Sequence, residues 1–198
     1  LDRSVEGLAP NEALFRRANE GRGLTRPELA IFLSTAKLSA QVRVEEAPFA
    51  QAESMDSELL AAFPDLMVKS HKSAILAHRL RKEIIATKLA NRMINRLGML
   101  HPFELAEEEG CGLGDVAAAF AIAERIYDLP SLWNAIDTTA MPESVRLMLF
   151  NQAAVETRAQ MADIIRNAHE GRDVSGATAV YAPVVQKLTA ALDGLLPN

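Results

Sequence analysis

The run His78-Arg79-Leu80-Arg81-Lys82-Glu83-Ile84-Ile85-Ala86-Thr87-Lys88-Leu89-Ala90-Asn91 decides the fold class of this chain. Neither Gly nor Pro occurs between Lys69 and Leu97, and Gly98 follows directly. Gly is a common terminator of helices, so the pattern predicts one long helix over about residues 69–97. Its apolar residues cover most of the circumference, which predicts a spine helix that the rest of the fold largely buries.

Composition points the same way as this run. The chain has 198 residues, is 49% hydrophobic and only 5% aromatic, and holds 10 Gly and 9 Pro. Abundant helix formers and the lack of any convincing strand pattern predict an all-α protein, built as a multi-helix bundle. The length fits one helical domain over residues 1–198, with a possible subdivision near 98–114.

The segments before the run are predicted to be shorter helices and a loop. Thr25, Pro27 and Glu28 form a strong helix start, because Thr25 and Glu28 can cap each other's main-chain N–H groups. Residues 48–57 are expected to form a loop, and residues 58–63 a short helix.

The segments after Gly98 are also predicted to be helices. Residues 102–109 predict a short acidic helix, and Asp115 is expected to cap a helix that begins at Val116. Pro142 should open a long helix to about His169, and a last helix should cover residues 177–195. Trp133 is expected to be a core anchor.

Positive charge is concentrated in a chain whose formal net charge is −5. Lys69–Arg96 contains eight Lys or Arg and one acid, and at 100° per residue four of these cations form a basic stripe: Arg81, Lys88, Arg92 and Arg96. Three interpretations stay open. The stripe can be a solvent-exposed face, a surface that docks onto acidic groups, or a site for nucleic acid or another phosphate. We predict contact with acidic surface, in a partner domain or in residues 101–115 of this chain.

No pattern of a catalytic, cofactor-binding or metal site is found. Gly110-Cys111-Gly112-Leu113-Gly114 lacks the G-x-G-x-x-G spacing and the preceding strand of a dinucleotide loop, so it predicts a helix end and a loop. The four histidines, His71, His78, His101 and His169, do not form a metal-binding motif. Glu107–Glu109 is expected to be solvated, or a counter-charge to the basic stripe.

Cys111 is the one cysteine, and its acidic neighbours argue against a reactive thiolate. It cannot form an internal disulfide, which favours a reducing cytoplasm. No apolar run approaches the roughly 18 residues that span a membrane, and no signal peptide is found. Because the chain begins at Leu1, we expect it to be part of a longer polypeptide.

Three segments of the chain resemble the C-terminal region of the large bacterial NAD-specific glutamate dehydrogenases. They occur in the family's order and, with their surroundings, extend over about residues 8–137. Arg92 stands where the resemblance implies an acidic residue. The segments are Gly23-Leu24-Thr25-Arg26-Pro27-Glu28-Leu29-Ala30 with Ala36-Lys37-Leu38, His78–Asn91 with Asn95-Arg96 and Gly98, and Asp115-Val116-Ala117 with Tyr127-Asp128-Leu129-Pro130-Ser131-Leu132-Trp133.

The resemblance implies a parent enzyme that oxidises L-glutamate to 2-oxoglutarate and ammonia with NAD. This chain would be its non-catalytic helical domain, which packs on the catalytic domain of the same polypeptide or supports a homo-oligomer. NAD would bind in the parent and no cofactor in this fragment, and no catalytic or cofactor residue carries over to any position here. The alternative is a free-standing helical regulator that binds an anionic partner such as nucleic acid through the basic stripe; a membrane partner is not expected.

Overall fold

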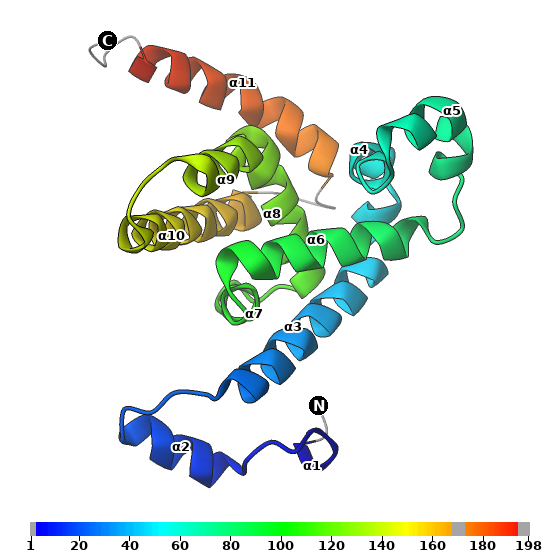
Figure 1. Cartoon of the computed structure of the whole chain (residues 1–198). Coiled ribbons are helices and arrows are strands. Elements are labelled where there is room, and N and C mark those ends of the chain that lie inside the picture. Colours follow the sequence, from blue (N-terminus) through cyan, green and yellow to red (C-terminus); the bar gives the residue numbers. More distant parts are fainter. Residues whose placement is uncertain (1–2, 168–172, 194–198) are drawn as a thin grey trace.

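The computed structural model describes residues 3–167 and 173–193, and this part of the chain contains helices and turns but no strand (Figure 1). The predicted all-α class is therefore confirmed. The elements are α1 (Arg3–Glu6), α2 (Asn11–Asn19), α3 (Arg26–Glu46), the 3₁₀ turns η1 (Pro48–Gln51) and η2 (Glu53–Met55), α4 (Asp56–Leu60), α5 (Asp65–Leu76), α6 (Arg81–Leu97), α7 (His101–Glu108), α8 (Leu113–Ile126), α9 (Leu129–Thr138), α10 (Glu143–Asn167) and α11 (Val174–Asp193).

The centre of the fold is α8. It packs against α3, α6, α7, α9, α10 and α11, and 11 of its 14 residues are buried. Its sequence explains this, because Ala117, Ala118, Ala119, Ala121 and Ala123 let neighbouring helices approach closely on several sides. In Figure 1 the N-terminal helices α1 and α2 extend away at one end of the molecule, and α4 and α5 project at another.

The predicted single helix over residues 69–97 is wrong in its extent. The chain forms α5 and α6 with a break at residues 77–80, and Gly98, at φ +94°, ends α6 as expected. The second half fits the expected burial, since α6 packs extensively against α3 and buries Ile85, Leu89 and Met93. Most of α5, by contrast, is exposed.

His78 supplies the physical reason for the break. Its Nδ1 accepts a hydrogen bond from the Leu80 main-chain N–H at 3.2 Å, and its ring packs on Phe63 with centroids 6.3 Å apart. The side chain thus gives the main chain a partner outside the helical ladder. The contact with Phe63 could not be predicted from the sequence, because residues 69–97 contain no Gly or Pro to mark a break.

The start of α3 follows the predicted capping box. The Thr25 N–H donates to Glu28 Oε2 at 2.8 Å, and the Glu28 N–H donates to Thr25 Oγ1 at 3.4 Å. The expected loop over 48–57 is wrong, because these residues form η1, η2 and the start of α4. The next short helix accordingly begins at Asp56 and ends at Leu60, instead of covering 58–63.

The glycine-rich run joins α7 to α8. Gly110 takes a positive φ of 60°, and the Cys111 N–H donates to the Ala106 carbonyl at 3.0 Å, so this is the predicted helix end. The cap of α8 is Gly112, not Asp115 as expected. Asp115 lies in the first turn, and its Oδ2 accepts from the Gly112 N–H at 3.0 Å, which is the reciprocal half of a capping box.

The C-terminal helices complete the bundle. Trp133 of α9 is buried at 2% exposure and stacks on Phe150 of α10, with centroids 6.2 Å apart, as expected of a core anchor. Helix α11 begins at Val174, where the Asp173 carboxylate accepts two main-chain N–H groups, so Pro183 lies inside the helix. The predicted helix ends at His169 and Leu195 lie outside the described residues.

No helix of residues 3–167 and 173–193 is both long and apolar enough to cross a membrane.

Gly114 sets the distance between α8 and α3. A Cβ at this position would lie 2.9 Å from the Ala47 Cβ and 3.3 Å from the Arg43 carbonyl oxygen. We therefore expect Gly114→Ala to lower the free energy of unfolding by about 1–2 kcal/mol, although Ala is the better helix former. Gly23→Ala is the control, because nothing lies within 4 Å of its Cβ, and we expect a change within about 0.5 kcal/mol. Urea unfolding measures both, and equal midpoints would show that the two helices have room to separate.

Candidate functional site

The basic stripe lies along a groove of about 690 Å³ on the polar face of α6. Three of its four cations line the groove: Lys88, Arg92 and Arg96. Uncharged side chains complete the lining, namely Thr87, Asn91 and Asn95. Arg81 lies at the start of the same helix, so α6 presents all four predicted residues, but each of them also has a partner within this chain.

Arg92 is the most enclosed of these cations. Its Nε and Nη2 donate to the two Glu124 oxygens, both at 2.7 Å, and Nη1 and Nη2 donate to the two Glu58 oxygens, both at 3.1 Å. Glu124 is 4% exposed. One guanidinium therefore joins α6 to both α4 and α8 through two paired-oxygen contacts, which are the strongest kind of ion pair in proteins.

The electrostatics of this cluster follow from its burial. Burial in α8 raises the pKa of Glu124 above its usual range, although the Arg92 guanidinium acts in the opposite direction. Burial, the largest single effect, would lower the pKa of Arg92, but the hydrogen bonds and negative charges of Glu124 and Glu58 together outweigh it and raise that pKa. Arg92 is thus charged at any working pH, and a change that removed it would leave two carboxylates side by side.

The other three cations are held from different elements. Arg81 pairs with Asp56 at 2.6 Å and donates to the Ala52 carbonyl at 2.7 Å. Arg96 pairs with Asp137 of α9 at 3.3 Å and lies 5.5 Å from the ring centroid of Trp133, a cation–π distance. Lys88 bonds only a main-chain group in the described part of the chain, the Ala61 carbonyl at 2.8 Å.

These contacts change the interpretation of the stripe. A solvated face does not describe the three arginines, whose side chains are between 17% and 29% exposed. The carboxylates that they contact lie outside residues 101–115, the segment that sequence reasoning considered. Sequence alone could not find them, because they come from α4, α8 and α9, up to 41 positions away.

The acidic cluster Glu107–Glu109 has a different partner from the one considered. Glu108 pairs with Arg158 at 2.6 Å, and Glu109 takes the Arg166 guanidinium at 2.5 and 2.9 Å. Both arginines belong to α10. The cluster therefore fixes α7 to α10 and does not neutralise the basic stripe.

The cysteine and the histidines, considered as reactive or metal-binding residues, lie apart from one another. Cys111 is half-buried at the end of α7 and packs against the core. His71 and His101 lie on α5 and α7, and His169 lies outside the described residues. Within residues 3–167 and 173–193, no three His, Cys, Asp or Glu side chains come together in a way that could hold a metal ion.

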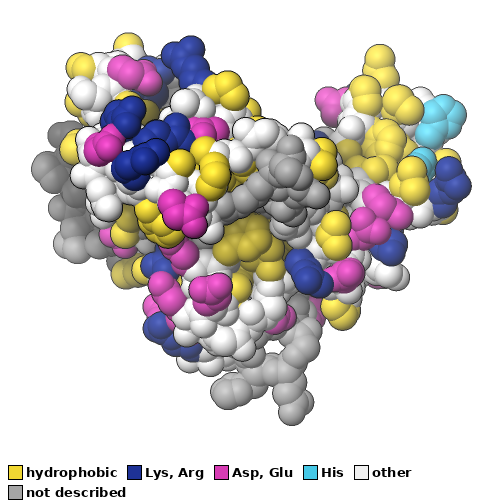
Figure 2. Space-filling view, turned by 90° about the horizontal axis from the view of Figure 1, so that it is seen from below, with side chains coloured by type: hydrophobic (Ala, Val, Ile, Leu, Met, Phe, Trp, Pro, Cys, Tyr) yellow, Lys and Arg dark blue, Asp and Glu magenta, His cyan; other side chains and the backbone are white. Residues whose placement is uncertain are grey.

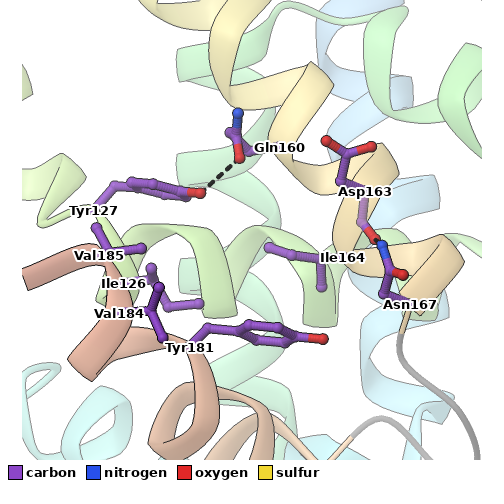
Figure 3. Close-up of a pocket in the computed structure, with 9 residues that line it drawn as sticks. All are labelled: Ile126, Tyr127, Gln160, Asp163, Ile164, Asn167, Tyr181, Val184 and Val185. Atoms are coloured by element: carbon purple, nitrogen blue, oxygen red, sulfur yellow. Dashed lines mark hydrogen bonds between the residues drawn. The ribbon is translucent and has the colours of Figure 1, made fainter. Parts of the chain in front are cut away.

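Sequence reasoning missed a pocket of about 250 Å³ between α8, α10 and α11 (Figure 3). Its residues come from helices up to 59 positions apart, Ile126 to Val185, so only the packing of α10 and α11 against α8 could reveal it. The Tyr127 hydroxyl donates to Gln160 Oε1 at 2.6 Å. Burial, and then the Asp163 charge, raise the pKa of Tyr127. The lining is Ile126, Tyr127, Gln160, Asp163, Ile164, Asn167, Tyr181, Val184 and Val185.

The Arg92 cluster gives a stability prediction. Arg92→Met leaves Glu58 and Glu124 without their shared cation, so we expect the free energy of unfolding to fall by about 3 kcal/mol. Arg43→Met is the matched control, because Arg43 and Glu46 form an exposed pair, and it should cost within about 0.5 kcal/mol. Adding Glu124→Leu to Arg92→Met should restore much of the loss. If chemical denaturation gives Arg92→Met and Arg43→Met the same midpoint, the cluster does not stabilise the fold.

Comparison with known proteins extends over almost the whole chain. The family profile described as "Glutamate dehydrogenase, C-terminal" matches residues 21–198. The NAD-specific glutamate dehydrogenase of Pseudomonas aeruginosa is 27% identical over 198 residues, which is 99% of this chain and 12% of that protein. The enzyme of the same name from Halomonas elongata is 30% identical over 139 residues, or 69% of this chain and 8% of that protein.

A third relative, the NAD-specific glutamate dehydrogenase of Mycobacterium tuberculosis, is 27% identical over 158 residues, or 80% of this chain and 10% of that protein. The chain thus spans about a tenth of the length of these relatives. The match to the family profile includes the long helices α3 and α10, the enclosed helix α8 and the basic stripe of α6. By that match, the chain belongs to the glutamate dehydrogenase C-terminal family.

Proposed function

We propose that this chain is a non-catalytic helical domain of a large NAD-dependent glutamate dehydrogenase, and that it serves interdomain packing or oligomer assembly. The observation that carries the proposal is the match of residues 21–198 to the family profile, together with relatives of whose length the chain spans about a tenth. The parent would deaminate L-glutamate oxidatively to 2-oxoglutarate and ammonia with NAD, in the reducing cytoplasm that a lone cysteine favours.

Exposed apolar surface supports a packing role. Helix α10 exposes Leu147, Met148 and Val155 by more than half, and α11 exposes Val180 and Val184 by 65% each. Large apolar residues grouped on consecutive turns of a helix are typical of a surface that another protein segment covers. These two helices are therefore the first candidates for contact with the rest of the parent.

The projecting helix α5 offers a second such surface. Leu66 is 78% exposed and Met67 is 45% exposed. Figure 2 shows hydrophobic side chains gathered with His and Lys or Arg on the part that projects at the right, where Figure 1 places α4 and α5. A small, mixed apolar and basic protrusion suits insertion into a recess of a partner domain.

The groove on α6 remains our candidate for polar docking. Arg81, Lys88, Arg92 and Arg96 would hold their intramolecular partners and present their outer N–H groups to acidic groups of the catalytic domain. Lys88 contributes most to this contact, because it is the one stripe cation that no carboxylate of the described residues pairs with. A second copy of the chain is the other partner that we consider.

The alternative function, a regulator that binds nucleic acid through the stripe, gains little from this geometry. Nucleic-acid binding is favourable when uncompensated Lys or Arg side chains neutralise phosphates and so release the counterions that surround the nucleic acid. Three of the four stripe cations are already neutralised by carboxylates within the fold. Lys88 alone among the four has no carboxylate partner in the described residues, and one such cation gives much less affinity for nucleic acid than a stripe of four would.

The docking groove gives a test in the parent enzyme. Lys88→Glu should weaken assembly or interdomain docking there, because it reverses the free charge, while the isolated chain keeps its melting temperature within about 2 °C. Arg16→Glu is the control, since Arg16 is an exposed cation on α2, outside the groove and outside the apolar faces of α5, α10 and α11. Sedimentation and thermal melting of the parent measure the effect. Equal results for the two charge reversals would rule out docking at the groove.

A second test concerns the non-catalytic role. The isolated 198-residue chain should neither bind NAD at micromolar concentration nor turn over glutamate, because residues 3–167 and 173–193 provide no strand-to-helix phosphate turn. Isothermal titration with NAD measures binding, and NADH absorbance measures turnover. Saturable binding of NAD would contradict the proposal and direct attention back to Gly110–Gly114.

A further inference from the structure

The pocket between α8, α10 and α11 has two chemically different sides. Its apolar side consists of Ile126 and Ile164, and of Val184, Val185 and the Tyr181 ring on α11. In Figure 3 the polar ends of Gln160, Asp163 and Asn167 follow the α10 side, and the Tyr127 hydroxyl points toward Gln160. A ligand here would have an apolar body and one polar end.

The polar side offers acceptors of hydrogen bonds and a negative charge. Among the described residues, Asp163 has one cation partner, Arg166, at a loose 3.6 Å, because Glu109 holds that guanidinium at 2.5 and 2.9 Å. The Asn167 Nδ2 donates to the Asp163 main-chain carbonyl at 2.8 Å, so its Oδ1 is the atom left to accept. The lining drawn from residues 3–167 and 173–193 includes no Lys or Arg.

We propose that this pocket binds a small organic ammonium group carried on a branched apolar body. The Asp163 carboxylate and Asn167 Oδ1 would receive the ammonium N–H groups, and the faces of Tyr127 and Tyr181 would add cation–π attraction. The volume of about 250 Å³ equals about eight water molecules, which suits a body of four to six carbon atoms.

Other ligand classes fit the pocket less well. An anion would meet the Asp163 charge without a compensating cation in the lining. A metal ion would find one carboxylate and two amides, with isoleucine and valine in place of further ligands. A purely apolar ligand would displace water from Asp163 and Asn167 without replacing its hydrogen bonds.

The ammonium could come from a free amine or from a lysine side chain of the parent polypeptide. Both sources have the same chemistry, which is an ammonium at the end of an apolar chain. Recognition of a free amine by residues 126–185 does not depend on the proposed function, whereas the lysine source rests on it, because that lysine belongs to the parent polypeptide.

Isopentylamine and its neutral counterpart 3-methylbutan-1-ol test the charge requirement on the 198-residue chain. We expect saturable binding of the amine at about millimolar concentration, as is usual for six heavy atoms, and about threefold to fivefold weaker binding of the alcohol. Ethylamine, which lacks three carbons, should bind at least about tenfold more weakly than isopentylamine. Chemical shifts of the Tyr127 and Asn167 amides in heteronuclear NMR measure all three.

Asp163→Asn is the decisive variant. It should remove the preference for the amine over the alcohol and leave the melting temperature unchanged, because Asp163 is exposed. Glu156→Gln is the matched control: it removes the same charge from an exposed position two turns earlier on α10, outside this pocket, and should keep the preference. Equal binding of amine and alcohol, no saturable binding, or equal effects of the two variants would overturn the proposal.

The same measurements on the parent enzyme distinguish a free amine from a lysine side chain as the source of the ammonium. If a lysine of the polypeptide occupies the pocket, isopentylamine should no longer shift Tyr127 in the parent, and Asp163→Asn should weaken interdomain docking there. If a free amine is the ligand, the parent should bind isopentylamine as the isolated chain does. Asp163→Asn should then abolish only the preference for the amine over the alcohol. Either result supports the shared ammonium chemistry.

Discussion

The enclosure of α8 is the constraint on which the rest of the structure depends. A helix that contacts α3, α6, α7, α9, α10 and α11 has almost no face left for a polar side chain, yet Glu124 lies on it at 4% exposure. A buried carboxylate is stable only with a cation and a full set of hydrogen bonds. Arg92 supplies both and reaches Glu58 as well, so one guanidinium joins α6 to both α4 and α8.

This constraint also decides what is left on the surface. The arginines of the stripe are used to join α6 to α4, α8 and α9, and Glu108 and Glu109 are used to join α7 to α10. Charges that look like a binding patch in the sequence therefore act mostly inside the fold. What the surface offers to other molecules is the Lys88 ammonium, the apolar turns of α5, α10 and α11, and the Tyr127–Asp163 pocket.

Such a division suits the role that we propose for the chain, which spans about a tenth of the length of its relatives. Its own ion pairs hold the helices together, and its exposed apolar turns are available for contact with other parts. The pocket next to α11 adds a site whose chemistry differs from both, because it combines an apolar wall with the Asp163 carboxylate, which pairs only loosely with Arg166 at 3.6 Å among the described residues.

The sequence by itself determined the helical class, the Thr25 capping box, the ends of helices at Gly98 and Gly110, and the family. These depend on residues within a few positions of one another, and local hydrogen bonding and helix periodicity decide them. Trp133 could also be assigned to the core, because the one tryptophan of the chain has a large apolar ring system whose burial is favourable.

The tertiary structure alone decided the break at residues 77–80, the central place of α8, the partners of the stripe and the pocket. Each depends on contacts between residues far apart in the chain: Phe63 with His78, Arg43 and Ala47 with Gly114, and Arg92 with Glu124. Helix periodicity shows which side chains share a face of one helix. It does not show which other helix meets that face, because that choice is made by shape and charge complementarity among all the helices at once.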